Sequence, residues 1–171
     1  QRAYGGFSEE GFSKLFGVGY SDFCALDAPN IFFEGQDALV NPTKYALYND
    51  CLCGVFDNNI TFDEKFYRKQ VEMLPRPPGS WGILFRTAES LMKVLLLKAT
   101  LGRETRAYYR AGDREGLSRL LERKYAPLLS AAEQFYRDFR DEWFSFNKPF
   151  GWEVQDIRLG GLISRIRTCM E

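Results

Sequence analysis

Residues 81–111, WGILFRTAESLMKVLLLKATLGRETRAYYRA, decide the fold of this chain. Apolar or small side chains recur there at steps of three and four residues, which is the spacing of one face of an α-helix. Further apolar side chains widen this stripe almost all round, as expected of a helix at the centre of a bundle. We therefore predict one long helix from Trp81 to Ala111, with Ser80 as its N-cap. Its core stripe comprises Leu84, Ala88, Leu91, Leu95 and Gly102.

A second long helix is expected directly after the first. Gly112 ends the first helix and Asp113 can cap the next, so the two helices run antiparallel. The second helix is expected from Arg114 to Phe146. Pro127 lies inside it, and we predict a kink where the carbonyl of Arg123 loses its hydrogen-bond partner. The core-facing stripe comprises Leu117, Leu121, Leu128, Ala132, Phe135, Phe139, Trp143 and Phe146.

A third long helix is expected from Trp152 to Cys169, after a break at Asn147-Lys148-Pro149. Gly160-Gly161 lies inside this helix and costs about 1 kcal/mol per residue in helix propensity. Such a pair usually marks a site of close helix–helix approach, and the alternative is that the two glycines simply loosen the helix.

Shorter helices are expected in the rest of the chain. Thr61 and Glu64 have the spacing of a capping box, and they open a helix that ends near Leu74, before a proline-rich linker. The first 60 residues predict short helices joined by turns, at residues 8–16, 21–26 and 43–50. The predicted fold is all-α, a single helical domain over residues 1–171. Residues 1–60 supply short helices and loops, and residues 61–171 form an antiparallel bundle of three long helices.

Composition excludes several classes of function. The chain has no histidine, which removes the commonest general base, the commonest metal ligand and every Ser-His or Cys-His nucleophile pair. The longest apolar run in the helical stretches is residues 94–97, whereas a membrane span needs about 20 apolar residues. We therefore predict no membrane partner, and nothing in the composition points to a catalytic residue, a cofactor or a metal site. The chain opens on Gln1 rather than on Met, and we therefore interpret it as a piece of a longer polypeptide. Its first residues do not have the pattern of a secretory signal.

The four cysteines indicate a cytoplasmic protein. Cys51 and Cys53 form a C-x-C rather than the C-x-x-C of redox and zinc sites, and Cys24 and Cys169 are isolated. We expect reduced thiols that pack as small hydrophobes, with a disulfide or a metal site as the alternative.

A run of arginines does not indicate nucleic-acid binding. Acidic side chains are interleaved with these arginines and the net charge is zero, so a solvated helical face is the better interpretation. The run comprises Arg103, Arg106, Arg110, Arg114, Arg119 and Arg123.

Two segments carry more polar and aromatic side chains than core packing requires: KYALYNDCLCGVFD at 44–57 and NKPFGWEVQDIRLGG at 147–161. Tyrosine, tryptophan and arginine are the side chains that anchor interfaces. Three interpretations stay open: polar groups satisfied locally, docking against another domain or subunit, and a ligand pocket. The candidate docking residues are Tyr45, Tyr48, Asn49, Asp50, Trp152, Asp156 and Arg158.

These segments, together with WGILFRTAESLMKVLLLKATLG and YYRAGDRE, resemble the C-terminal helical domain of bacterial family 20 glycoside hydrolases. These are the β-N-acetylhexosaminidases in which a helical domain follows the barrel. The resemblance covers roughly residues 7–167 and keeps the order of segments. NKPFGWEVQDIRLGGL and YALYND are its most specific motifs, and Cys51 and Cys53 map onto no family role.

The resemblance implies a parent enzyme that releases terminal N-acetylglucosamine or N-acetylgalactosamine, without a metal or organic cofactor. Its chemistry belongs to a (β/α)8 barrel, where an Asp-Glu pair works with the substrate's own 2-acetamido group. This sequence lacks β/α alternation, and Asp63-Glu64 and Asp141-Glu142 lie in helical context, so neither is carried over as that pair. The expected role is to support the barrel of the same polypeptide, in an enzyme of a type that forms dimers.

Two other classes of function compete with that hypothesis. One is an independent helical protein-interaction module that binds through the tyrosine-rich segment. The other is a self-contained enzyme, which would need a deep pocket lined by Asp, Glu and Tyr side chains.

Overall fold

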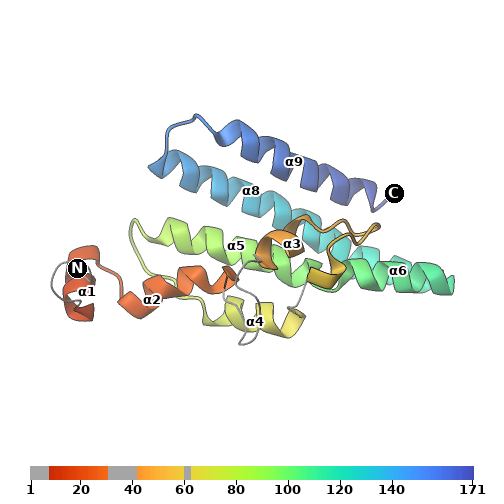
Figure 1. Cartoon of the computed structure of the whole chain (residues 1–171), viewed down its shortest axis with the longest axis horizontal. Coiled ribbons are helices and arrows are strands. Elements are labelled where there is room, and N and C mark those ends of the chain that lie inside the picture. The colour runs from red at the N-terminus through yellow and green to blue at the C-terminus, as the bar shows by residue number, and fades with distance from the viewer. Residues whose placement is uncertain (1–7, 31–41, 60–62) are drawn as a thin grey trace.

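The structure of the protein is a computed structural model that describes residues 8–30, 42–59 and 63–171. Every regular element in these ranges is helical, which confirms the predicted all-α fold (Figure 1). Within the same ranges, no helix combines the length and the apolar content that crossing a bilayer requires.

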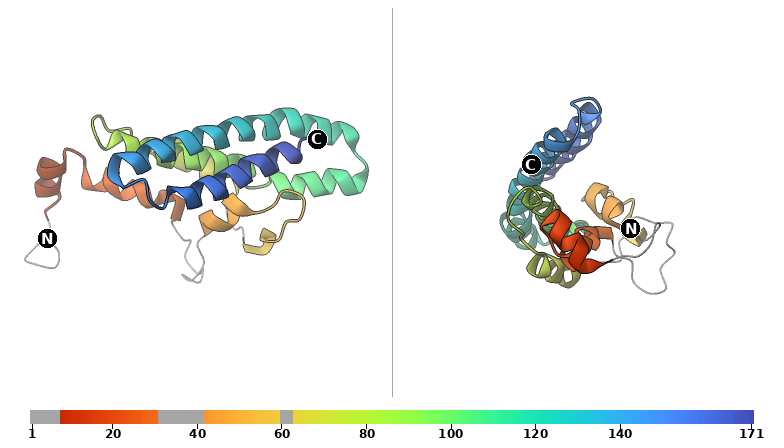
Figure 2. Two further views of the ribbon diagram at one scale, coloured as in Figure 1. Left: turned by 90° about the horizontal axis from the view of Figure 1, so that it is seen from above. Right: turned by 90° about the vertical axis from the view of Figure 1, so that its left-hand side faces the viewer.

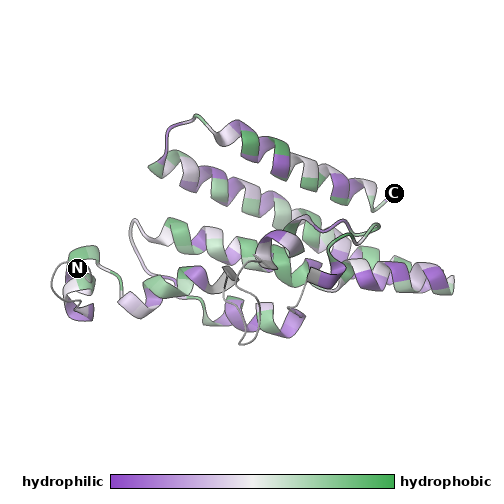
Figure 3. Ribbon diagram, in the orientation of Figure 1, coloured by the Kyte–Doolittle hydropathy of each residue, from purple (hydrophilic) through white to green (hydrophobic). Residues whose placement is uncertain are grey.

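Four helices lie side by side in the order α4, α5, α8 and α9 (Figure 1). These are α4 (Glu64–Met73), α5 (Gly82–Lys98), α8 (Ala126–Phe146) and α9 (Trp152–Thr168). The layer is curved, and the short helix α3 (Pro42–Tyr48) lies on its concave side (Figure 2). The three long helices α5, α8 and α9 run antiparallel, as predicted, and polar and apolar residues alternate along them (Figure 3).

The helix predicted from Trp81 to Ala111 is two helices, because the chain breaks after α5 and resumes as α6 (Leu101–Ala111). At the break, the Thr100 hydroxyl donates to Glu64 Oε1 at 2.6 Å and accepts from Lys124 Nζ at 2.9 Å. These partners come from α4 and from the turn before α8, so the break is stabilised by tertiary contacts and carries no glycine or proline signal.

Helix caps agree with the sequence at some ends and correct it at others. Ser8 caps α1 (Glu9–Phe16), and Asp113 caps α7 (Arg114–Leu120) by accepting from Gly116 N–H at 2.7 Å. Ser80 is not the cap of α5, because Trp81 holds that position without a side-chain hydrogen bond. Thr61 lies outside the described residues, and Asp63 caps α4 by accepting from Phe66 N–H at 2.9 Å.

The other short elements fall near their predicted positions. Helix α2 (Tyr20–Cys24) begins one residue before Ser21 and continues as a 3₁₀ turn, η1 (Ala25–Asn30). Helix α3 covers most of the predicted 43–50 segment, and a second 3₁₀ turn, η2 (Asp57–Asn59), follows its loop.

A π-helical turn, η3 (Leu121–Tyr125), lies at the kink predicted for Pro127. Ala126 N–H donates to the carbonyl of Leu121, a step of five residues rather than four. The wider turn changes the helical register just before the proline, which therefore falls near the start of α8. The helix predicted from Arg114 to Phe146 is consequently three consecutive helical segments.

The core has two parts. The larger joins the three long helices to α3, α4, α6 and the turn before α8, and its fully buried side chains include Leu95, Leu101 and Leu128. The smaller lies under α1 and α2, where Phe85 and Met92 of α5 are buried.

The glycine pair of α9 makes no close approach to the parts of the chain that the structure describes, so the close-approach interpretation is wrong for them. Both glycines are exposed, and a Cβ built on Gly160 or Gly161 would have nothing within 4 Å. The close approach occurs instead at Gly102 of α6, where a Cβ would lie 3.2 Å from the carbonyl oxygen of Cys51. Gly102 thereby lets α6 pass against the loop after α3.

Candidate functional site

The loop that follows α3 is held in shape by its own first two side chains. Asp50 Oδ1 accepts from the backbone N–H groups of Leu52 and Cys53, both at 2.8 Å. Asn49 Oδ1 accepts from Phe56 N–H at 2.9 Å, and Asn49 Nδ2 donates to Asp57 Oδ1 at 2.8 Å. Turns closed in this way are typical of asparagine and aspartate. The loop at residues 49–57 therefore has a defined conformation, which its own side chains stabilise.

Arg106 of α6 fixes the middle of this loop. Its guanidinium donates to the Cys51 carbonyl at 3.0 Å and pairs with the Asp57 carboxylate. It also lies against Gly54, whose φ of 64° favours glycine. Arg106 was predicted to belong to a solvated arginine face, and that is wrong for this residue because its side chain is only 17% exposed.

Arg165 of α9 closes the loop from the other side. Its Nε lies 2.6 Å from Asp50 Oδ2 and its Nη2 lies 3.2 Å from Asp50 Oδ1, a two-point contact between residues 115 positions apart. The Arg165 guanidinium is the main cause that holds the pKa of Asp50 far below its ordinary range, and the two backbone N–H groups add to the effect. Asp50 thus links α3, its loop and α9.

Asp50→Asn is expected to lower the free energy of unfolding at pH 7 by about 1 kcal/mol, because a partly buried, charge-assisted pair is lost. The pKa of Asp50 is lower folded than unfolded, so its contribution is present above the unfolded pKa of about 4 and is lost as pH falls towards the folded value. Denaturant unfolding between pH 7 and pH 3 measures this change. The difference between wild type and Asp50→Asn should shrink with acid, and a constant difference would contradict it. Glu115→Gln, at an exposed position, is the matched control.

A buried lysine lies behind the loop. Lys98, in the last turn of α5, is 6% exposed and its Nζ donates to the Asn49 carbonyl at 2.8 Å. Burial lowers the pKa of Lys98, and the nearby Cys51, Asp50 and Cys169 oppose that shift. Lys98, Arg165 and the loop line a cavity of about 190 Å³ between α3, α5 and α9.

Two of the four free thiols meet beside this lysine. Cys169, just after the last residue of α9, lies beside the buried Cys51, and both residues line the same cavity. The Tyr125 hydroxyl lies 2.9 Å from the Thr105 hydroxyl, and it is close enough to Cys51 for each group to affect the pKa of the other. Cys24 and Cys53 are exposed and lie apart from this pair. No group of three or more His, Cys, Asp or Glu side chains in the described ranges is arranged to hold a metal ion.

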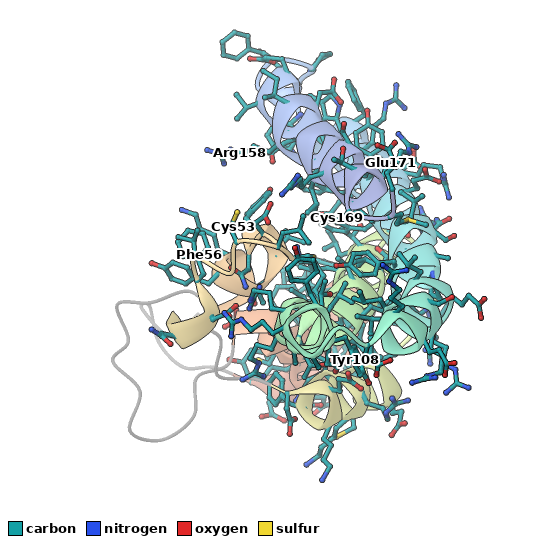
Figure 4. The ribbon with its side chains drawn as sticks, turned by 90° about the vertical axis from the view of Figure 1, so that its right-hand side faces the viewer. Cys53, Phe56, Tyr108, Arg158, Cys169 and Glu171 are labelled. Carbon is teal, nitrogen blue, oxygen red and sulfur yellow. The ribbon has the colours of Figure 1, made fainter. Side chains whose placement is uncertain are left out.

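The predicted docking residues separate into different surroundings. Tyr48 is half-buried, and the charge of Arg158 opposes the rise in pKa that burial gives its hydroxyl, so these two residues are neighbours. Arg158 extends from α9 on the side of the molecule where Cys53 and Phe56 lie (Figure 4). Tyr45 packs its ring edge against Phe56, with ring centroids 4.9 Å apart.

Three of the predicted residues serve this chain's own contacts. Trp152 is buried among aromatic rings of α8, including Phe139 at 5.4 Å and Trp143 at 5.9 Å between ring centroids. Asp156 accepts from the Tyr136 hydroxyl at 2.6 Å, on the opposite side of α9 from Arg158. Asn49 is buried in the loop. The accessible members of the set are therefore Tyr45, Tyr48, Asp50, Asp156 and Arg158, and they do not share one surface.

The sequence prediction missed the residues that complete the site. Lys98 falls on the apolar stripe of α5, three residues after Leu95 and four before Gly102, so its register could have indicated a buried cation. Cys169 and Arg165 carry no local signal that connects them to a loop more than a hundred residues earlier.

Comparison with family models identifies a family for most of the chain. The model described as the glycoside hydrolase 20C C-terminal domain matches residues 21–171, which include the loop, the buried lysine and all of α9. Comparison with curated proteins gives no match. Because the matched range covers most of the 171 residues, the family is shown. This chain belongs to the glycoside hydrolase 20C C-terminal domain family.

Proposed function

We propose that this chain is the non-catalytic helical domain of a bacterial, cytoplasmic β-N-acetylhexosaminidase, and that it packs against the catalytic barrel of the same polypeptide. The observation that carries the proposal is the family match, because that family is described as the C-terminal domain of a glycoside hydrolase. The adjacent carboxylates support a non-catalytic role. Asp63 is occupied as a helix cap, and Asp141 is 58% exposed and lies 4.0 Å from Arg86.

One face of α9 suits such docking. We call it the α9 docking face, formed by Ile157, Arg158 and Gly161 of α9 together with Tyr48 of α3. Ile157 is 75% exposed, and none of the residues placed by the structure comes within 4 Å of a Cβ built on Gly161. Tyr48 and Arg158 add the residue types that anchor interfaces. Within this proposal, Gly161 is the site of close helix approach that the sequence indicates. The helix or strand that approaches it belongs to another domain.

Gly161→Ala is expected to act in opposite directions in two contexts. In the 171-residue chain it should stabilise by up to about 1 kcal/mol, because alanine has the higher helix propensity and no neighbour is in the way. In the longer enzyme it should destabilise, because the added methyl group meets the barrel. Gly160→Ala is the matched control, since Gly160 is equally open in the chain but lies on the side of Asp156. Thermal unfolding of both variants in both contexts measures the effect.

The outcomes separate the candidate functions. If Gly161→Ala stabilises the longer enzyme as much as Gly160→Ala does, barrel docking at this face is wrong. If it dissociates a homodimer and leaves the barrel contact intact, the face joins two subunits instead. A natural polypeptide without any barrel would favour the independent protein-interaction module.

A further inference from the structure

The hydrogen bond from Lys98 to the Asn49 carbonyl does not balance the charge of the lysine. Its ammonium group is buried, and among the described residues it forms no ion pair with a carboxylate. The carboxylate near it, Asp50, is already paired with Arg165. A buried cation without a counter-charge is costly, so a neighbouring group that can become an anion gains from its presence. The acids that remain beside Lys98 are the thiols of Cys51 and Cys169.

Donor groups converge on Cys51. The Cys169 thiol is the largest influence that lowers the pKa of Cys51, and the Lys98 charge and the Tyr125 hydroxyl add to it against the opposing effects of burial and Asp50. The pKa of Cys169 is raised, with its contact to Cys51 as the main cause, so Cys169 keeps its proton. The groups that face Cys51 thus come from α5, the loop, the turn before α8, and the end of α9. The two pKa shifts have opposite directions, so Cys51 is the thiol of the pair that loses its proton more readily.

We propose that Cys51 is a peroxide-reactive thiolate, and that oxidation joins it to Cys169 in a reversible disulfide. Both sulfurs line the 190 Å³ cavity between α3, α5 and α9, which is several times the volume of a water molecule, about 30 Å³, and admits hydrogen peroxide. Cys169 is only partly buried and follows the last residue of α9, so it can move the short distance that a disulfide needs. The inference does not depend on the proposed function.

The chemistry balances with hydrogen peroxide as the named oxidant. The Cys51 thiolate attacks one peroxide oxygen, the O–O bond breaks, and Cys51 becomes a sulfenic acid while hydroxide leaves. The Cys169 sulfur then attacks the Cys51 sulfur, the S–O bond breaks, and the hydroxyl leaves with the Cys169 proton as water. Two electrons pass from the thiol pair to peroxide in total. A dithiol reductant restores both thiols.

The disulfide would tie the end of α9 to the loop at residues 49–57. That connection crosses the same gap as the Asp50–Arg165 pair. It would hold the α9 residues of the docking face in one position relative to Tyr48 of α3.

The experiment treats the purified protein with hydrogen peroxide, blocks the remaining thiols, and maps cross-linked peptides by mass spectrometry. We expect a peptide pair joined through Cys51 and Cys169, reversed by dithiothreitol. Cys51→Ser and Cys169→Ser should each abolish it. A double variant, Cys24→Ser with Cys53→Ser, should leave it unchanged, since those thiols are exposed and outside the pair.

A second readout tests the thiolate. The rate at which iodoacetamide alkylates Cys51 should reach half its maximum well below the midpoint for an ordinary thiol, which is about pH 8.5. Lys98→Met should raise that midpoint and slow alkylation at pH 7 by about tenfold, the effect of about one pKa unit. A Cys51 that oxidises to sulfinic acid without cross-linking, a cross-link confined to Cys24 or Cys53, or an ordinary alkylation midpoint would each overturn the proposal.

Discussion

Leu128→Ala should lower the free energy of unfolding of this chain by about 2–5 kcal/mol. Leu128 has no exposed surface and lies on α8, where α8 packs most extensively against α5. Removing its isobutyl group loses the transfer free energy of the buried atoms and leaves a cavity, because the helices on either side are fixed by other contacts. An effect at the upper end of that range would take a large share of the stability of an ordinary domain, which is about 5–15 kcal/mol.

Urea unfolding followed by circular dichroism measures this loss. Leu15→Ala is the matched control, because Leu15 lies on α1 and is 72% exposed, so its loss should stay within about 0.5 kcal/mol. The urea midpoint should fall in Leu128→Ala while the slope of the transition stays unchanged. Similar losses for the two leucines would show that α5 and α8 do not form the core.

The long helices could be predicted because their signals are local. The stripe of α8 repeats over several turns, and Asn147 and Pro149 mark the break before α9, so the predicted bounds of α9 agree with the structure to within one residue. The break at Thr100 could not be predicted in this way. It depends on Glu64 and Lys124, which belong to other elements and meet Thr100 only in the folded chain.

The candidate site was predicted in part for the same reason. Aromatic and polar composition identified the segment around Tyr48 and Asp50, and it identified Arg158. The contacts that give the segment its chemistry come from α5 and α9, through Lys98 and Arg165. Composition also selected Trp152, whose ring fills a gap in the aromatic packing between α8 and α9. An aromatic residue in a core and one at an interface have the same sequence signal.

The glycine pair shows that a sequence can indicate close approach without indicating which element approaches. Two glycines in a helix permit close approach, but no element of the described chain occupies the space beside Gly160 or Gly161. Gly102, which the sequence presents as one more member of a core stripe, has the close backbone neighbour. Periodicity gives the face on which a residue lies and does not give the element that meets it.

Hydrolysis of a chromogenic N-acetylglucosaminide tests most directly whether this chain is scaffold or catalyst. Substrate-assisted cleavage of this kind requires an acidic pair converging on one sugar, whereas Asp63 is engaged as a helix cap and Asp141 is 58% exposed beside Arg86. The account predicts no turnover by the purified 171-residue chain, and turnover by the natural polypeptide that includes the barrel. Both should be prepared from a host lacking its own hexosaminidases. Turnover by the isolated chain under those conditions, lost on mutation of its own carboxylates, would contradict the account.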